Sequence, residues 1–300
     1  MAIAQSTTVA EMLTARTGRA VQIVGITTAG DVSKAQLTQI GGTGVFVSAL
    51  RESLLSGEID FAVHSLKDLP VGPVQAIMLA AVPPRDDPRD ALVARNGAKL
   101  ADLPAGARIG TGSPRRAAQL LLLRQDVKPV PTRGNAGTRL AKITSGEVEA
   151  VVLACSGLAR IGKLGVISQA FEADEMLPAP GQGALAVECL ASRPDMIELL
   201  SSIDDRASRA ATDAERSVLA ALEAGCSAPS GAYAAWTDEL RLDAIVVAAD
   251  GGAALRGSIS GPAAAATRLG REIAADLLAR GADRYTDVSG GHLSYGEDAK

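Results

Sequence analysis

Apolar and polar positions follow two alternating patterns through the first 190 residues of the chain. Short runs rich in Val, Ile and Ala are typical of buried strands, and the stretches between them repeat their apolar positions with a helical period. This order predicts α/β units, in which helices pack on a largely parallel sheet. We expect strands at residues 21–26, 59–63, 77–82, 107–110, 127–131, 150–154 and 184–188. We expect helices at residues 4–17, 45–56, 114–124, 135–145 and 206–224.

Two proline-rich segments, residues 83–90 and 177–183, interrupt this order. Neither suits a helix or an inner strand, so we interpret both as hinges. Two hinges around one α/β block predict a chain that leaves one domain, builds a second and returns. Beyond residue 204, a long helix, two strands and a further helix predict a small α+β domain. The expected boundaries are 1–84 with 184–202 for domain 1, 85–183 for domain 2 and 203–300 for domain 3.

Composition narrows the classes of function. Hydrophobic residues make up 47% of the chain and aromatic residues only 2%, so the cores must be built from aliphatic side chains. A net charge of −4 and few stacking residues argue against nucleic acid as a partner. The first eight residues lack a basic region and a long apolar run, so we expect neither an export signal nor a membrane anchor, and a cytoplasmic protein. Three dispersed cysteines and two histidines predict no disulfide and no metal site.

The most informative local pattern is an arginine pair at the start of a predicted helix. Ser113 suits the N-cap and Pro114 the first helical position, so Arg115 and Arg116 fall in the first turn. There they face the positive end of the helix dipole, at a cost of about 0.3–1 kcal/mol each unless an anion lies nearby. Two interpretations are open: a solvated basic turn, or an anion held by both guanidiniums and the free backbone N–H groups.

Other polar clusters follow neighbouring strands. Residues 60–70 and 131–140 leave predicted strands through Ser, Lys, Asp, Arg and Asn, as residues 108–120 do. Ligands of open α/β sheets bind outside the carboxyl ends of strands, so the three clusters are expected to converge on one cleft. Between residues 108 and 139 the basic residues concentrate against one acid, Asp126, which indicates a small anionic ligand. They are Arg108, Arg115, Arg116, Arg124, Lys128, Arg133 and Arg139.

Single residues allow a structural and a chemical interpretation. Asp68 beside Lys67 is either a surface ion pair or a carboxylate that steadies a cationic intermediate or moves a proton. Cys226 is either a small buried thiol or the holder of a covalent group. His64 is interpreted as a partly buried strand residue, and residues 41–44 as a lid over the cleft rather than a phosphate loop.

Taken together, these residues resemble the porphobilinogen deaminase (hydroxymethylbilane synthase) family. The matching segments are collinear over nearly the whole chain: residues 62–70, 86–90, 110–116, 133–139, 177–184 and 222–226. The resemblance implies two similar domains of the type II periplasmic-binding-protein kind, the first discontinuous, and a small α+β C-terminal domain. It also implies a monomeric transferase that joins four porphobilinogen molecules head to tail with loss of ammonia. Hydrolysis then releases linear hydroxymethylbilane for tetrapyrrole (haem and porphyrin) biosynthesis.

The resemblance also implies roles for individual residues. Cys226 would hold a dipyrromethane cofactor, itself made from porphobilinogen, through a thioether. Asp68 would be the catalytic carboxylate that helps to expel ammonia and stabilises the resulting azafulvene cation. The residues implied to contact the cofactor are Ser65, Lys67, Thr111, Ser113, Arg115, Arg116 and Asn135. Those implied to contact the substrate are Arg133, Arg139, Arg160 and Gln182, the last at a hinge.

The sequence departs from the family pattern at its start. Family members begin with a strand that ends in Arg-x-Ser, whereas residues 1–5 here align with the interior of the following helix, so we expect the native start to lie upstream. Ala29 replaces the Arg of a Thr-Arg-Gly-Asp motif, and Leu190 stands where the family often has Arg. Two alternatives stay open: a paralogue or truncated product that only binds anions or tetrapyrroles, and a receptor of the periplasmic type. A receptor would need an export signal and would have no use for Cys226.

Overall fold

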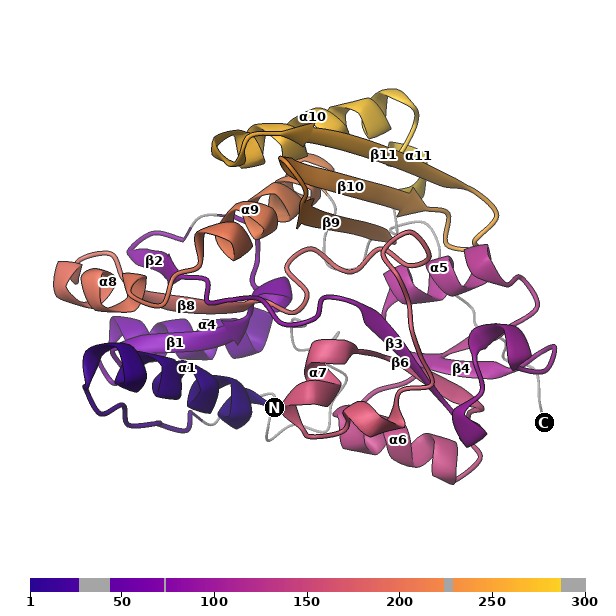
Figure 1. Ribbon diagram of the computed structural model, residues 1–300, viewed down its shortest axis with the longest axis horizontal. Helices are drawn as coiled ribbons and strands as arrows, with labels where there is room; N and C mark the ends of the chain where they lie inside the picture. Colours follow the sequence, from indigo (N-terminus) through magenta and orange to yellow (C-terminus); the bar gives the residue numbers. More distant parts are fainter. Residues whose placement is uncertain (27–43, 73, 224–228, 287–300) are drawn as a thin grey trace.

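The computed structural model describes residues 1–26, 44–72, 74–223 and 229–286. Figure 1 shows three sheets with helices packed against each of them. Cys226 and most of the predicted lid at 41–44 lie outside the described residues, as does Ala29. Within the described ranges no helix is long and apolar enough to span a membrane.

The first sheet joins segments that lie far apart in the sequence. Its order is β1 (Phe61–Ser65), β8 (Leu185–Leu190) and β2 (Ile77–Ala81), and both pairings are antiparallel. Helices α1 (Ala2–Thr17) and α8 (Pro194–Ser201) pack on one face through aliphatic side chains, and α4 (Gly44–Leu55) covers the other. The chain therefore returns to this sheet after building the second one.

One strand prediction is wrong for this sheet. Residues 21–26 form no strand, and Ile23 and Val24 are 44% and 45% exposed. Among the described residues no strand pairs with this β-branched run, and tertiary pairing rather than local propensity decides whether such a run becomes a strand. His64 is buried on β1, as predicted, beside Glu188 and Arg51.

The second sheet has five strands in the order β5-β4-β6-β3-β7. Strand β4 runs parallel to β5 and β6, whereas β3 runs antiparallel to β6 and β7. Helix α5 borders one face, and α6 and α7 border the other. The strand bounds are Asp90–Ala94 (β3), Arg108–Thr111 (β4), Lys128–Pro131 (β5), Ala150–Ala154 (β6) and Gln169–Ala170 (β7). The helix bounds are Pro114–Leu123 (α5), Ala136–Thr144 (α6) and Cys155–Arg160 (α7).

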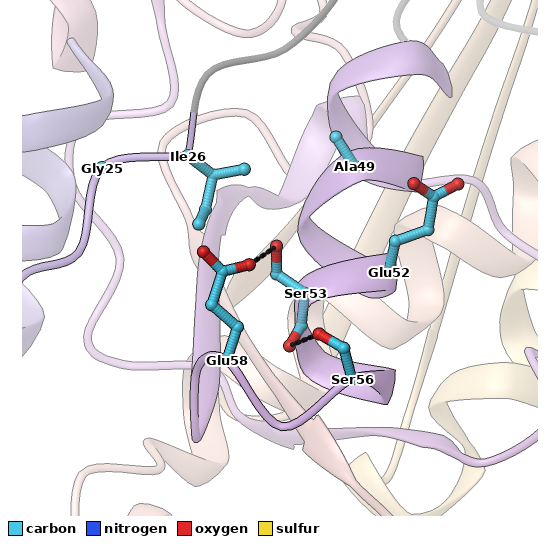
Figure 2. Close-up of a pocket in the computed structure, with 7 residues that line it drawn as sticks. All are labelled: Gly25, Ile26, Ala49, Glu52, Ser53, Ser56 and Glu58. Carbon is cyan, nitrogen blue, oxygen red and sulfur yellow. Dashed lines mark hydrogen bonds between the residues drawn. The ribbon is translucent and has the colours of Figure 1, made fainter.

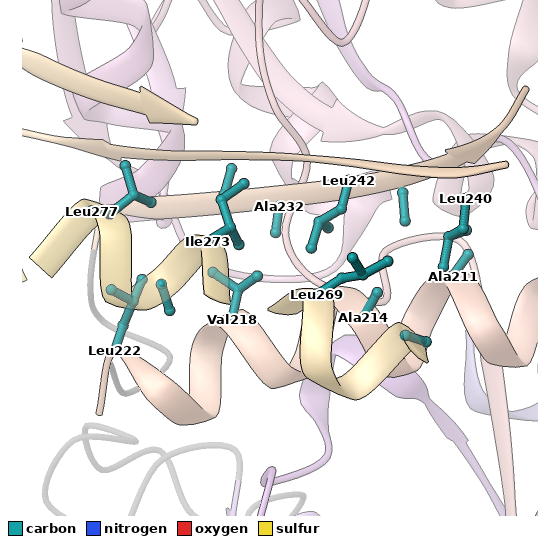
Figure 3. Close-up of a cluster of buried hydrophobic side chains, with 14 of the residues drawn as sticks. Ala211, Ala214, Val218, Leu222, Ala232, Leu240, Leu242, Leu269, Ile273 and Leu277 are labelled. Atoms are coloured by element: carbon teal, nitrogen blue, oxygen red, sulfur yellow. The ribbon is translucent and has the colours of Figure 1, made fainter. Parts of the chain in front are cut away.

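The third sheet is an antiparallel meander of β9 (Ser230–Trp236), β10 (Leu240–Val247) and β11 (Ala254–Gly261). Figure 3 shows α9 (Arg206–Ala221) and α10 (Ala266–Ala279) on one face, joined to it by buried aliphatic side chains. The opposite face meets α5 of the second sheet. A short helix, α11 (Asp283–Thr286), follows. The fold is thus α/β with a small α+β C-terminal unit.

Candidate functional site

The turn that leaves β1 carries the predicted catalytic carboxylate. A short 3₁₀ helix, η1 (Leu66–Asp68), begins where the backbone N–H of Leu66 donates to the carbonyl oxygen of Ala184 at 3.0 Å. The side chain of Leu66 is buried, and that of Asp68 is exposed. Lys67, between them, is half-buried and donates from Nζ to Oε1 of Gln182 at 3.2 Å.

The start of α5 has the capping that its sequence predicts. The Oγ of Ser113 accepts a hydrogen bond from the backbone N–H of Arg116, and Pro114 occupies the first turn. Thr111, buried at the end of β4, accepts from the backbone N–H of Ser113. These bonds fix the direction in which Arg115 and Arg116 leave the helix.

The solvated basic turn is the wrong interpretation of this arginine pair. Arg115 and Arg116 are 4% and 6% exposed, and the carboxylate of Asp90, which is fully buried at the start of β3, lies between them. Arg115 Nη1 lies 2.7 Å from Oδ2 of Asp90, and Arg116 Nε lies 2.8 Å from Oδ1. Burial alone would raise the pKa of Asp90, but the two guanidiniums outweigh it and hold that pKa far below its usual range. The chain itself thus supplies one of the anions that the pair needs.

Gln182 links this group to the turn after β1. Its side chain is fully buried, and Nε2 donates to Oδ1 of Asp90 at 3.0 Å and to the carbonyl oxygen of Pro88 at 2.7 Å. Its Oε1 accepts from Lys67 and, at 3.4 Å, from Arg116. A residue of one hinge segment therefore connects elements of the first and second sheets.

Four cations gather around this link, and we call Lys67, Arg115, Arg116 and Arg139 the cationic cluster. Burial, and then the charge of Arg116, lower the pKa of Lys67 to about 8. The same two causes lower the pKa of Arg139. The Nε of Arg115 is buried without a hydrogen-bond partner among the described residues, which costs about 1–3 kcal/mol in the absence of an acceptor. The cluster is short of negative charge and of acceptors, as a binding site for carboxylates requires.

The other predicted site residues lie in different surroundings. Ser65 accepts a hydrogen bond from Gln5 of α1, and Asn135 caps α6 through the backbone N–H of Thr138. Arg133 is exposed. Arg160, at the end of α7, pairs with Asp86 and donates to the carbonyl oxygen of Gly183 at 2.8 Å, so it holds both hinge segments. Cys226 lies outside the described residues.

A separate cavity of about 460 Å³ lies between residues 25–26 and α4. Figure 2 shows that its charged side chains are Glu52 and Glu58, the latter accepting a hydrogen bond from Ser53. An acidic lining repels carboxylates, so this cavity does not suit an anionic ligand.

Replacing Asp90 by Asn tests the electrostatic description of the site. We expect the free energy of unfolding at pH 7 to fall by about 3–5 kcal/mol, because the change leaves two buried guanidiniums without their counter-charge. Denaturant titration measures this loss. As a control, Asp243→Asn removes the partner of Arg241 in an exposed pair and is expected to cost less than about 1 kcal/mol.

The pH dependence of the Asp90 effect follows from the direction of its pKa shift. The pKa of Asp90 is lower in the folded than in the unfolded state. Its contribution to the free energy of unfolding is therefore complete above about pH 4 and is lost as the pH falls further. The difference in stability between the parent protein and Asp90→Asn should therefore narrow below pH 4. This description would be contradicted if Asp90→Asn and Asp243→Asn lowered the free energy of unfolding equally. It would also be contradicted if the difference in stability between the parent and Asp90→Asn did not change with pH.

Comparison with known proteins finds related sequences that match nearly the whole chain. A model described as "Porphobilinogen deaminase, dipyromethane cofactor binding domain" matches residues 1–198, and one described as "Porphobilinogen deaminase, C-terminal domain" matches residues 210–279. A protein named porphobilinogen deaminase from Thermobifida fusca is 57% identical over 95% of this chain and 92% of its own length. Porphobilinogen deaminase 1 of Streptomyces coelicolor is 51% identical over 94% of this chain and 93% of its own. The Mycobacterium tuberculosis protein of this name is 46% identical, with 94% of each chain covered.

Solved structures with a similar chain path include periplasmic domains of about 19% identity or less. A mutant VFT2 domain of Bordetella pertussis BvgS matches 66% of this chain and 76% of its own, at 19% identity and a TM-score of 0.40. A putative periplasmic sulfonate-binding protein from Methylobacillus flagellatus matches 66% of this chain and 60% of its own, at 18% identity and a TM-score of 0.38.

Proposed function

This chain belongs to the porphobilinogen deaminase family, and we propose that Asp68 and the cationic cluster carry out the family's reaction in it. The enzyme is a transferase of tetrapyrrole biosynthesis that yields hydroxymethylbilane. At each condensation the carbon–nitrogen bond of a porphobilinogen aminomethyl group breaks, ammonia leaves, and that carbon bonds to a free pyrrole carbon, which loses a proton. After the last condensation, hydrolysis by water releases the linear product.

The observation that carries this proposal is the meeting of one exposed carboxylate with buried, incompletely paired cations. Asp68 and Lys67 are consecutive, and Lys67 shares Gln182 with Arg116. Pyrroles that bear acetate and propionate groups need cations for their carboxylates and one anion for the charge that develops on carbon. The neighbouring positions of Lys67 and Asp68 and the shared Gln182 support this proposal.

We propose that Asp68 acts on the reacting carbon. Its carboxylate forms no hydrogen bond with the described residues and is exposed, so it is available to a ligand. As ammonia leaves, positive charge develops on the substrate carbon, and a nearby carboxylate lowers the energy of that state. The same group can accept the pyrrole proton that is lost when the new bond forms.

The residues present also fit the dipyrromethane cofactor of this family. The Nε of Arg115, which has no hydrogen-bond partner among the described residues, and the further N–H groups of Lys67 and Arg139 are donors that its carboxylates can satisfy. We propose that Cys226 holds this cofactor, which anchors and primes the growing chain when bound. We also propose further hydrogen bonds from Thr111 and Ser113, which lie at and just after the end of β4, and from Ser65 at the end of β1. Asn135, Arg133, Arg160 and Gln182 are proposed as contacts to the cofactor or the substrate on the resemblance alone.

We further propose the three-domain division at 1–84 with 184–202, 85–183 and 203–300. The return of β8 to the first sheet supports a discontinuous first domain, and the separate cluster of α9, α10 and the third sheet supports a third one. A monomer in the cytoplasm is proposed from the family resemblance alone.

A product assay tests the proposed function. The purified chain, given porphobilinogen, is expected to release four molecules of ammonia for each hydroxymethylbilane formed, with both products quantified in the same reaction. A protein that only binds anions would retain porphobilinogen in equilibrium dialysis without releasing ammonia. That outcome would contradict the transferase function.

A further inference from the structure

Helix α9 contacts four separate segments of the molecule through two consecutive side chains. Glu215 is fully buried, and its carboxylate accepts from both Nη atoms of Arg85 at 2.6 and 3.0 Å. The same carboxylate accepts from the backbone N–H groups of Gly181 at 2.7 Å and Ala234 at 2.9 Å. Glu215 therefore ties both hinge segments to the third sheet, and it fixes the position of α9 against them.

Arg216, the next residue, contacts the turn that carries Asp68. Its Nη1 donates to the carbonyl oxygen of Leu69 at 2.9 Å and, more weakly, to that of Leu66 at 3.3 Å. Its Nη2 donates to the carbonyl oxygen of Pro70 at 2.8 Å. One planar guanidinium thus bonds three carbonyl groups on the two sides of Asp68, a geometry that suits Arg and that a Lys ammonium cannot reproduce.

The position of the Asp68 carboxylate depends on the backbone of this turn. The side chain of Asp68 forms no hydrogen bond with the described residues, so among them no hydrogen bond orients it directly. The turn is fastened at its start by the backbone bond from Leu66 to Ala184, and within itself by the bond from Leu69 to Leu66. Its far end is held by Arg216. Figure 1 shows α9 between the third sheet and strands β2 and β8, where it can hold the turn from the C-terminal unit.

We propose that Arg216 is a positioning residue, which sets the position of the Asp68 carboxylate relative to the C-terminal unit that contains α9. This inference rests on the proposed role of Asp68. Helix α9 ends at Ala221, shortly before Cys226 in the sequence. A single helix therefore connects the turn that bears the catalytic carboxylate with the segment proposed to bear the cofactor. In this proposal Arg216 acts on Asp68 through the carbonyl groups of the turn.

A matched control lies two turns earlier on the same helix. Arg209 also reaches from α9 to carbonyl groups of the first sheet, those of Ala80 at 3.1 Å and Leu79 at 3.5 Å. These carbonyls belong to β2, away from the Asp68 turn. Arg209→Lys therefore weakens the same kind of contact between α9 and the first sheet without touching the turn.

The test compares Arg216→Lys and Arg216→Gln with Arg209→Lys in the full-length holoenzyme. We expect kcat to fall roughly 10- to 100-fold in the Arg216 variants, more for Gln than for Lys, because a displacement of about 1 Å in a catalytic group has effects of this size. KM should stay within about threefold of the parent value, since ground-state binding is retained. Thermal midpoints should match that of Arg209→Lys, and intact mass should show the covalent cofactor in each variant.

The possible outcomes separate this inference from the proposed function. Parent-like kcat in the Arg216 variants, or a loss of kcat that is equalled by Arg209→Lys or explained by the unfolded fraction, overturns the positioning role. Asp68→Asn is assayed alongside. If it keeps full turnover, the proposed role of Asp68 fails, and the inference fails with it. If Asp68→Asn is inactive while the Arg216 variants are unimpaired, only the inference fails.

Discussion

Asp68→Asn is expected to lower kcat by roughly 10²–10⁴-fold, the range that general acid–base groups contribute, while the fold stays intact. Asn has the size of Asp but can neither carry the negative charge nor accept the proton. Asp68 is exposed at the end of η1 and forms no hydrogen bond with the described residues, so its replacement removes no structural contact among them. Steady-state rates of ammonia release from porphobilinogen measure the effect.

Asp60→Asn is the matched control for Asp68→Asn. Asp60 is exposed, immediately precedes β1 and pairs with Arg193, whereas Asp68 follows the other end of that strand. We expect Asp60→Asn to turn over at the parent rate. Loss of activity in both variants would show that removing a negative charge near either end of β1 lowers turnover, without a specific role for Asp68. Parent-like activity of Asp68→Asn would show that another group performs the chemistry.

The local features of the site could be predicted from sequence, because short-range chemistry determines them. Ser113 and Pro114 mark the start of α5, and the first-turn arginines indicate a nearby anion. The identity of that anion could not be predicted in the same way. Asp90 lies 25 residues before Arg115, at the end of a proline-rich segment interpreted as a hinge, and only the pairing of β3 in the second sheet brings the two together.

Strand predictions failed where pairing rather than local pattern decides. Residues 21–26 have a suitable β-branched pattern and form no strand. Conversely, β3 was missed because it begins within the proline-rich segment, and β9 because it follows a loop rich in Gly, Pro and Ser. The two-residue strand β7 was missed as well. In all three missed strands a neighbouring strand supplies the hydrogen bonds that stabilise the extended backbone. The short helices α7 and α8 were also missed.

A signal for the α9 contacts was present in the sequence, although the sequence interpretation did not use it. Ala211, Glu215, Val218 and Leu222 follow one another at helical spacing, so a carboxylate occupies a position of the apolar stripe. A charged residue in such a stripe indicates a buried, paired group, and Glu215 is one. Its partner, Arg85, and the turn held by Arg216 could be identified only from the three-dimensional contacts.

Cys226→Ser is expected to eliminate turnover, because the proposed attachment atom of the cofactor is lost. The structure offers a control in Cys189, which is buried in the first sheet, where burial raises the pKa of its thiol. Such a thiol is a poor nucleophile, so Cys189→Ser should retain the covalent cofactor. The polar hydroxyl in an apolar core lowers the stability of that variant, so its activity is compared per folded molecule.

The most direct test of the central claim is the intact mass of the purified, active chain. The family assignment and the cationic cluster predict a covalent adduct of two pyrrole units. The adduct should be absent in Cys226→Ser, be present in Cys189→Ser, and gain further pyrrole units on brief exposure to porphobilinogen. An unmodified mass in protein that turns over porphobilinogen would contradict the claim, as would an adduct that survives the loss of Cys226.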